Sequence, residues 1–237
     1  MIMIKFIIIR KEKSKVFNIF DFFTMLVPGV IISILFCISL SYKYYETWNT
    51  FGSEKYTVFI IISYLCGVAM QQIGNILDEK VLYKYIYGGH PREIFLLKDE
   101  YNKVLNSELS YNEALKIREH IIDKYEINCK NIKNIKQLNV LVFSYCLILE
   151  EKNHLTYKSD KMLVISEMSR SLFLGCIFTL FLNFFMIYKY KSYYKFYMIE
   201  SILLLVLAFI FAYRKVQYEK YRYNSVLKTF LVYMNEK

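Results

Sequence analysis

Four long apolar runs limit what this chain can fold into more than any other feature of its sequence. Each run is close to the roughly 20 residues that an α-helix needs to cross the hydrocarbon layer of a bilayer. A soluble core rarely requires four such runs in a chain of 237 residues. We therefore predict an all-α membrane protein with four transmembrane helices. The runs are residues 19–40, 56–70, 171–188 and 196–213.

The composition agrees with a chain that is partly solvated by lipid, since 56% of the residues are hydrophobic and 18% are aromatic. The net charge of +10 leaves anionic lipid, nucleic acid and nucleotides open as partners. The charge also has a neutral explanation, because A/T-rich codons enrich Lys, Asn, Ile, Tyr and Phe together. The five cysteines are scattered singly and give no sign of a disulfide framework.

The distribution of Lys and Arg predicts the orientation in the membrane. Basic residues are frequent before the first run, between the second and third runs, and after the fourth, whereas the first loop carries only Lys43 and Lys55. Both termini should therefore be cytoplasmic, in a multi-pass protein of the bacterial inner membrane. The loop at 189–195 departs from this rule with three lysines, but its tyrosines suit an interfacial belt in which Lys can snorkel.

The polar stretch between the second and third runs predicts a mainly helical cytosolic module. Ser110 and Glu113 have the spacing of a capping box, and the apolar segment 137–151 is the expected core helix. Ser159 and Asp160 offer an N-cap for the helix that continues into the third span. The predicted division is an N-terminal segment at 1–18, spans 1 and 2 at 19–78, the module at 79–161, spans 3 and 4 at 162–213, and a basic C-terminal helix at 214–237. That last helix lies either on inner-leaflet lipid or on the module.

No pattern in the sequence is typical of catalysis or of a metal site. His90, His120 and His154 are far apart, and none has a metal-ligand partner three or four positions away. No P-loop, G-x-G-x-x-G or G-x-S-x-G motif occurs. We therefore predict no enzymatic activity, no cofactor and no bound metal.

Charged residues near the ends of the spans have structural interpretations. Asp21 suits a helix N-terminus. Glu167 and Arg170 have the i,i+3 spacing of an ion pair, and Glu200 is expected to be solvated at the outer end of the fourth span. Pro28 should distort the first span, because it lacks a backbone N–H.

The second span becomes polar on one face toward its end, in the stretch YLCGVAMQQIGNILDEK at residues 64–80. Lipid would penalise such a stripe, so it must face protein or water. One interpretation is a close helix contact, in which small residues allow approach and amides bond across. The other is the cytosolic mouth of an oligomeric pore, where Asp78 adds a ring of carboxylates that favours cations. The candidate pore-lining residues are Gly67, Gln71, Gly74, Asn75 and Asp78, which recur every three or four positions, with Gln72 at the margin.

Basic side chains in the predicted module form a second candidate site. Three lysines recur every three residues in the connector CKNIKNIK, residues 129–136. Together with basic residues elsewhere in the module they would cradle the phosphates of an anionic ligand. The alternative is a solvated face, and the connector has no aromatic platform that would specify bases. The candidate ligand-binding residues are His90, Arg92, Arg118, Lys130, Lys133 and Lys136.

Several motifs in the spans carry a resemblance. An Asp precedes a Pro-Gly pair in the first span, Y-x-x-G-x-x-x-Q-x-x-G occurs in the second, an Arg precedes Leu-Gly in the third, and an Arg- and Tyr-rich helix follows the fourth. The residues are Asp21, Pro28 and Gly29; Tyr64, Gly67, Gln71 and Gly74; Arg170, Leu174 and Gly175; and Arg214, Tyr218 and Arg222. With them the chain resembles small bacterial membrane effectors of antiphage defence, and the nearest type is the oligonucleotide-gated channel of Hailong-like systems. The resemblance covers the spans and hardly touches residues 79–161.

The resemblance implies a pore opened by a short nucleic acid that a partner nucleotidyltransferase makes. Our leading hypothesis is accordingly an oligomeric inner-membrane ion channel, opened by an anionic signal on its cytosolic side and acting in antiphage defence. The helices at 71–87 and 155–170 would couple the module to the pore. The expected partners are the lipid bilayer, further copies of the chain with a tetramer as the starting hypothesis, and the nucleotide or oligonucleotide ligand, but not double-stranded DNA. The alternative is a non-conducting membrane scaffold or subunit that recruits a cytosolic partner.

Overall fold

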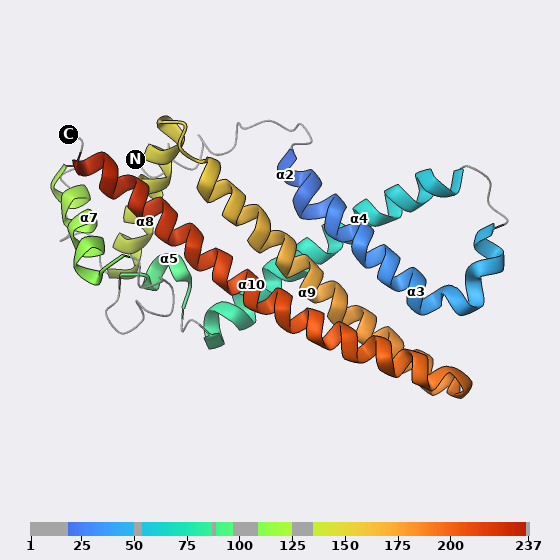
Figure 1. Ribbon diagram of the computed structural model, residues 1–237. Helices are drawn as coiled ribbons and strands as arrows, with labels where there is room; N and C mark the ends of the chain where they lie inside the picture. The colour runs from blue at the N-terminus through green and yellow to red at the C-terminus, as the bar shows by residue number, and fades with distance from the viewer. Residues whose placement is uncertain (1–18, 50–53, 87–88, 97–108, 125–134, 236–237) are drawn as a thin grey trace.

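The computed structural model describes residues 19–49, 54–86, 89–96, 109–124 and 135–235. Every regular element in these ranges is a helix (Figure 1), which confirms the predicted all-α class. Four helical segments are long and apolar enough to cross a membrane, as predicted. They are Phe22–Leu40, Glu54–Tyr85, Tyr157–Lys189 and Tyr194–Asn235. The predicted N-terminal segment at 1–18 lies outside the described residues.

The first apolar segment begins with α2 (Ile19–Asp21), continues through the π-helical turn η1 (Phe22–Leu26), and becomes α3 (Val27–Asn49). In η1 the backbone N–H of Val27 donates to the carbonyl of Phe22, five residues earlier. This widened turn lies directly before Pro28, which has no N–H to offer to the helical ladder. The expected distortion of the first span therefore takes the form of a π-helical turn.

The second apolar segment is α4 (Glu54–Leu77), which continues without a break into the π-helix η2 (Asp78–Ile86). In Figure 1, α4 crosses α3 and passes beneath α9 (Tyr157–Lys189) at a steep angle. Both α3 and α4 contact α9. The start and the end of the second segment therefore lie on opposite sides of α9.

The third and fourth apolar segments form a long antiparallel pair. Helix α9 is joined to α10 (Tyr194–Asn235) by the 3-10 turn η4 (Lys191–Tyr193). The two helices lie side by side over most of their length (Figure 1), and they share a small core. That core consists of Cys176, Leu180, Leu204 and Ala208.

A larger core lies at the other end of the molecule, which we call the distal core. It joins α5 (Pro91–Ile94), α7 (Tyr111–Lys124) and α8 (Ile135–Lys152) to the last turns of α10. Phe143 of α8 is fully buried in it, so the segment predicted as a core helix does form one. The basic C-terminal helix packs on this core through Tyr223, Val226, Leu227 and Phe230, in agreement with one of the two predicted placements.

The start of α7 has the predicted capping box. The backbone N–H of Ser110 donates to Oε2 of Glu113 at 2.7 Å, and the backbone N–H of Glu113 donates to Oγ of Ser110 at 3.2 Å. Two N–H groups at the helix end, which lack intrahelical partners, are thereby satisfied. The hydrogen bond from Ser110 lowers the pKa of the Glu113 carboxyl.

The predicted start of α9 was wrong. The helix begins at Tyr157 with Thr156 at the N-cap position, so Ser159 and Asp160 already lie in its first turn. The Ser159 hydroxyl lies 2.7 Å from Oε2 of Glu150, where it contacts the end of α8 instead of capping α9. Likewise Glu200 is not simply solvated, because Oγ of Ser39 donates to its Oε1 at 2.8 Å.

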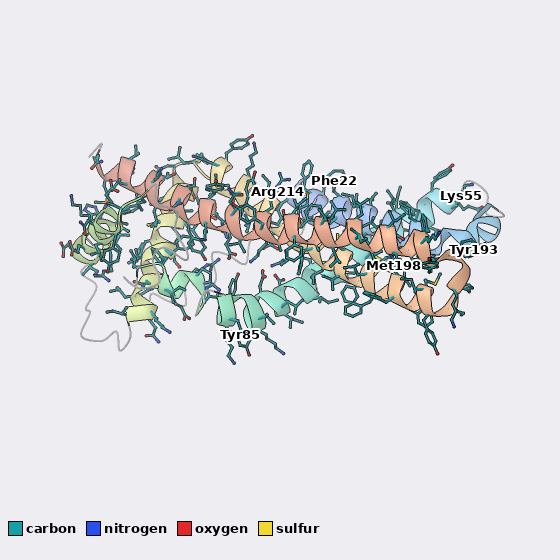
Figure 2. The ribbon with its side chains drawn as sticks, turned by 60° about the horizontal axis from the view of Figure 1, so that its bottom comes forward. Phe22, Lys55, Tyr85, Tyr193, Met198 and Arg214 are labelled. Carbon is teal, nitrogen blue, oxygen red and sulfur yellow. The ribbon has the colours of Figure 1, made fainter. Side chains whose placement is uncertain are left out.

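The apolar segments expose large hydrophobic side chains on their outer faces, as expected of helices solvated by lipid. Figure 2 places Lys55 and Tyr193 near one end of the bundle, and Phe22 and Arg214 toward the other. The first turn of α4 and the η4 turn therefore lie at the same end of the bundle. Examples of the exposed residues are Ile60, Ile61, Leu65, Phe181, Phe184, Phe185, Ile199, Ile202, Leu203 and Phe209.

Candidate functional site

The glycines of the predicted stripe face the chain's own helices. A Cβ atom built on Gly67 would lie 1.9 Å from the carbonyl oxygen of Met25, and one built on Gly29 would lie 1.9 Å from that of Ser63. A Cβ on Gly74 would lie 2.6 Å from Nε of Arg170. These positions therefore allow close helix contacts, the first of the two interpretations of the stripe.

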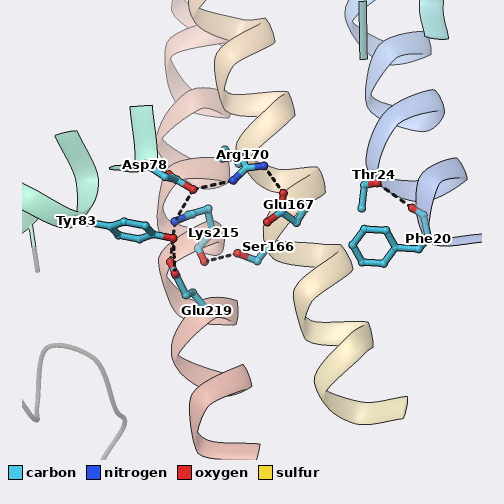
Figure 3. Close-up of polar contacts among 9 residues, drawn as sticks. All are labelled: Phe20, Thr24, Asp78, Tyr83, Ser166, Glu167, Arg170, Lys215 and Glu219. Carbon is cyan, nitrogen blue, oxygen red and sulfur yellow. Dashed lines mark hydrogen bonds and ion pairs between the residues drawn. The ribbon is translucent and has the colours of Figure 1, made fainter. Parts of the chain in front are cut away.

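Asp78 also faces inward, at the point where α4 becomes η2. Its Oδ2 accepts a hydrogen bond from Nη1 of Arg170 on α9 at 2.9 Å and lies 3.2 Å from Nζ of Lys215 on α10 (Figure 3). The side chains of all three residues are less than a tenth exposed. In the single chain the Asp78 carboxylate is thus neutralised by two cations and does not stand at an open mouth.

The amides of the stripe lie at its outer edge. Successive residues of an α-helix are rotated by about 100°, which places Gln71 at about 40°, Asn75 at about 80° and Gln72 at about 140° from Gly67. Their burial follows this order: Gln71 is half-buried, whereas Gln72 and Asn75 are exposed on the surface of the chain. The predicted stripe therefore splits into an inner face of Gly67, Gly74 and Asp78 and an outer face of amides. A pore-lining role for these residues stays a prediction.

Asp78 belongs to a larger polar cluster between η2, α9 and α10, which we call the junction (Figure 3). Nζ of Lys215 donates to Oε2 of Glu219 at 2.7 Å, and the Tyr83 hydroxyl donates to Oε1 of Glu219 at 3.2 Å. Arg170 also pairs with Glu167, as the i,i+3 spacing predicted. Removing Arg170 or Lys215 would leave buried carboxylates without their counter-charge. The junction comprises Asp78, Tyr83, Glu167, Arg170, Lys215 and Glu219.

A cavity of about 230 Å³ opens beside the junction. The side chains of Arg92 from α5 and Arg222 from α10 line it, and neither has a salt-bridge partner within 4.0 Å among the described residues. The Arg92 guanidinium lies 5.8 Å from the centre of the Phe143 ring, which anchors it to the distal core. The cavity is lined by Asp78, Tyr83, His90, Arg92, Leu163, Ser166, Glu167, Lys215, Glu219, Arg222 and Tyr223.

His90 holds the wall of this cavity in place. It precedes α5 as the N-cap residue, and its Nδ1 accepts a hydrogen bond from the backbone N–H of Arg92 at 3.2 Å. Burial and the nearby Arg92 guanidinium lower the pKa of His90, so the ring is neutral near pH 7 with its proton on Nε2. The ring lies 4.7 Å from that of Tyr83, and these two residues also line a second hollow of about 240 Å³.

Of the six predicted ligand-binding residues, the structure brings His90 and Arg92 together at this cavity. Arg118 on α7 and Lys136 on α8 are not among its lining residues. Lys130 and Lys133 lie outside the described residues. A single cradle made by all of these residues is therefore not formed in the part of the chain that the structure describes.

The patterns in the sequence did not identify Lys215, the cation that α10 contributes to the junction. Lys215 and Glu219 have i,i+4 spacing directly after the fourth apolar run, a signal for a helical ion pair that was available in the sequence. Nothing in the sequence indicated that Lys215 would reach Asp78. Within the described residues, no group of His, Cys, Asp and Glu side chains could hold a metal ion.

The comparisons with known proteins do not assign the chain to a family. No family model, curated protein or solved structure matches the chain.

Proposed function

We propose that this chain is a subunit of an oligomeric ion channel of the bacterial inner membrane, with a cytosolic helical module that controls the spans. The junction is the observation that supports this most strongly. It ties the end of the second apolar segment to α9 and α10 through Asp78, Arg170 and Lys215. Helix α10 then continues from the junction directly into the distal core. A rearrangement of the distal core would therefore change the ion pairs that hold the end of the second span.

Gating requires a signal that favours one arrangement of the helices over the other, because a ligand with equal affinity for both states shifts nothing. The cavity beside the junction meets this need, since η2, α5, α9 and α10 all contribute to its lining. A ligand bound there would contact both the distal core and the end of the second span. The resemblance to antiphage effectors suggests an anionic signal, such as a short oligonucleotide made by a partner nucleotidyltransferase.

The outer amides supply the argument for an oligomer. Gln72 and Asn75 are exposed in the single chain, on a segment whose other exposed side chains are mostly apolar. Lipid penalises exposed amides, so a second copy of the chain or shared water is the better environment. We place Gln72 and Asn75 at the cytosolic mouth of the pore, with Asp78 held in ion pairs while the pore is closed.

Ion flux from liposomes that contain the purified protein tests this function. Replacing Asn75 by Leu or Gln72 by Leu should change the conductance at least severalfold without changing thermal stability. Ala69→Leu is the matched control, because Ala69 is exposed on the same helix and is already apolar. Equal conductance in well-folded N75L, Q72L and A69L proteins would exclude the outer amides from the pore.

A specific observation also favours the alternative, a non-conducting scaffold that recruits a cytosolic partner. Three of the predicted pore-lining residues, Gly67, Gly74 and Asp78, are sealed against helices of the same chain. A scaffold needs such internal packing but no shared pore. Absence of flux under every ligand condition, together with stable binding of a soluble partner, would replace the channel by the scaffold.

A further inference from the structure

Two guanidinium groups at the cavity beside the junction are not used by the ion pairs of the junction. Arg92 and Arg222 both line this cavity and have no salt bridge among the described residues. Nε of Arg222 is buried and has no hydrogen-bond partner in the described part of the chain. An unpaired buried N–H group is costly, and an anionic acceptor beside it would satisfy it.

The acidic residues around the cavity do not fill this role, because the other cations already bind them. Asp78 accepts from Arg170 and lies beside Lys215, while Glu219 accepts from Lys215 and from the Tyr83 hydroxyl. Glu167 pairs with Arg170. Arg92 and Arg222 are therefore the two lining cations that no carboxylate in the described part of the chain binds in a salt bridge. Arg92 hydrogen-bonds the Tyr223 side chain, and Arg222 feels the charges of Glu219 and Glu167 from a greater distance.

We propose that this cavity binds a phosphate group, with Arg92, Arg222 and Nε2–H of His90 donating to its oxygens. The planar fork of an arginine matches the oxygens of a phosphate or a carboxylate, which it binds through two parallel hydrogen bonds. The hydrogen bond at Nδ1 of His90 leaves Nε2–H as the donor of that ring. This phosphate site rests on the proposed function in one respect: it would be the place where the anionic signal binds.

The size of the cavity limits the ligand. Its volume of about 230 Å³ is below the roughly 300–1,000 Å³ of sites that enclose a drug-sized molecule. One phosphate or diphosphate group therefore fits inside, and any larger remainder must lie outside. The second hollow adjoins the cavity at Tyr83 and His90, so a remainder would extend past these two rings. The phosphate belongs either to a soluble phosphate ester or to a lipid headgroup.

Thermal denaturation of the full chain in nanodiscs tests the site without any measurement of flux. In phosphatidylcholine nanodiscs, inorganic pyrophosphate should raise the Tm, and half-saturation should require at least about tenfold more pyrophosphate in Arg222→Gln and in Arg92→Gln. Lys116→Gln removes an exposed cation on α7 and should behave as the wild type. A second arm replaces part of the phosphatidylcholine by phosphatidic acid and omits pyrophosphate.

The two arms separate the sources of the phosphate. A Tm rise with pyrophosphate that R222Q and R92Q weaken assigns a soluble ligand, and a rise only with phosphatidic acid that both variants remove assigns a lipid. A rise that is equal in R222Q, R92Q and K116Q, or no rise in either arm, overturns the site. If either glutamine variant has an altered Tm without ligand, the lysine variant at the same position, Arg222→Lys or Arg92→Lys, replaces it, and intermediate affinity is then expected. Binding that depends on Arg222 in a protein without ion flux would keep the site and remove the channel.

Discussion

Asp78 and Arg170 are 92 positions apart in the sequence, yet their side chains meet at 2.9 Å within the helical bundle. Arg170 reaches Asp78 across Gly74, where a side chain would collide with the guanidinium. Lys215 completes the contact from a third helix. One carboxylate thus holds three helices together, and its removal should affect all of them.

We predict that Asp78→Asn lowers the free energy of unfolding by about 1–3 kcal/mol, the usual cost of leaving buried hydrogen-bond donors without their acceptor. The loss arises because Arg170 and Lys215 lose the carboxylate that they share, whereas Glu167 and Glu219 still pair with them. Chemical denaturation in detergent micelles, followed by circular dichroism, measures it.

The double variant Asp78→Asn/Lys215→Met, compared with the two single variants, measures the interaction between these side chains. Its loss of stability should be smaller than the sum of the two single losses, because each single substitution already removes the contact between Asp78 and Lys215. Additive losses would show that Lys215 and Asp78 do not interact energetically.

Gly67→Ala should destabilise the contact between the first two apolar segments. The new methyl group would lie 1.9 Å from the carbonyl oxygen of Met25, which belongs to the backbone and cannot rotate away. Overpacking of this kind costs about 1–3 kcal/mol, and more where the backbone must move. Thermal denaturation in detergent should show a lower Tm, whereas Ala69→Val on the exposed face of α4 should leave the Tm nearly unchanged.

Glu150 should make stability depend on pH. Its side chain is buried at the end of α8, and this burial raises its pKa above the ordinary value of 4.5, although the hydrogen bond with Ser159 acts in the opposite direction. A carboxyl with a raised pKa in the folded state stabilises the fold below pH 4.5, and this contribution is lost as the pH rises through the folded-state pKa.

Glu150→Gln should therefore be close to the wild type in stability near pH 4.5 and more stable near pH 8. A gain of about 1 kcal/mol would raise the Tm by roughly 2–4 °C in a chain of this size. Thermal denaturation across this pH range measures the difference. Glu151→Gln, at the exposed neighbouring position, controls for the lost charge, and parallel pH curves for all three proteins would contradict the assignment.

Ser110→Ala should loosen the first turn of α7. The substitution removes the acceptor for the N–H of Glu113 and leaves that donor without its cap. Loss of an N-cap costs about 1 kcal/mol, which corresponds to roughly fivefold faster amide hydrogen exchange in the first turn. Lys116→Ala on the exposed face of α7 should leave this exchange unchanged.

The spans and the capping box could be predicted because their signals are local in the sequence. Twenty consecutive apolar residues, or a Ser and a Glu three positions apart, carry the same physical meaning in any fold. The junction could not be predicted in this way. The angle at which α4 crosses α9 determines whether Asp78, Arg170 and Lys215 meet. The spacing of residues along a single helix carries no information about that angle.

The polar stripe on the second span is a second example of a feature that the sequence predicts only in part. Steps of three and four residues grouped Gly67, Asn75 and Asp78 on one side, but a rotation of about 80° is enough to take Asn75 from the packed face to the exposed one. The start of α9 was missed because Ser159 is a good cap by residue type, but Glu150 lies beside its hydroxyl. In both cases a contact from another helix decided the outcome.

Helix α10 runs for 42 residues without interruption, from the η4 turn to the distal core. At 1.5 Å per residue it is a rod of about 60 Å, twice the thickness of the hydrocarbon layer. A rod of this length works as a lever: a tilt of about 5° around the junction displaces a far end about 30 Å away by roughly 3 Å. Small repacking among Tyr223, Val226 and Phe230 would thus be felt at the opposite side of the bilayer without any ligand entering it.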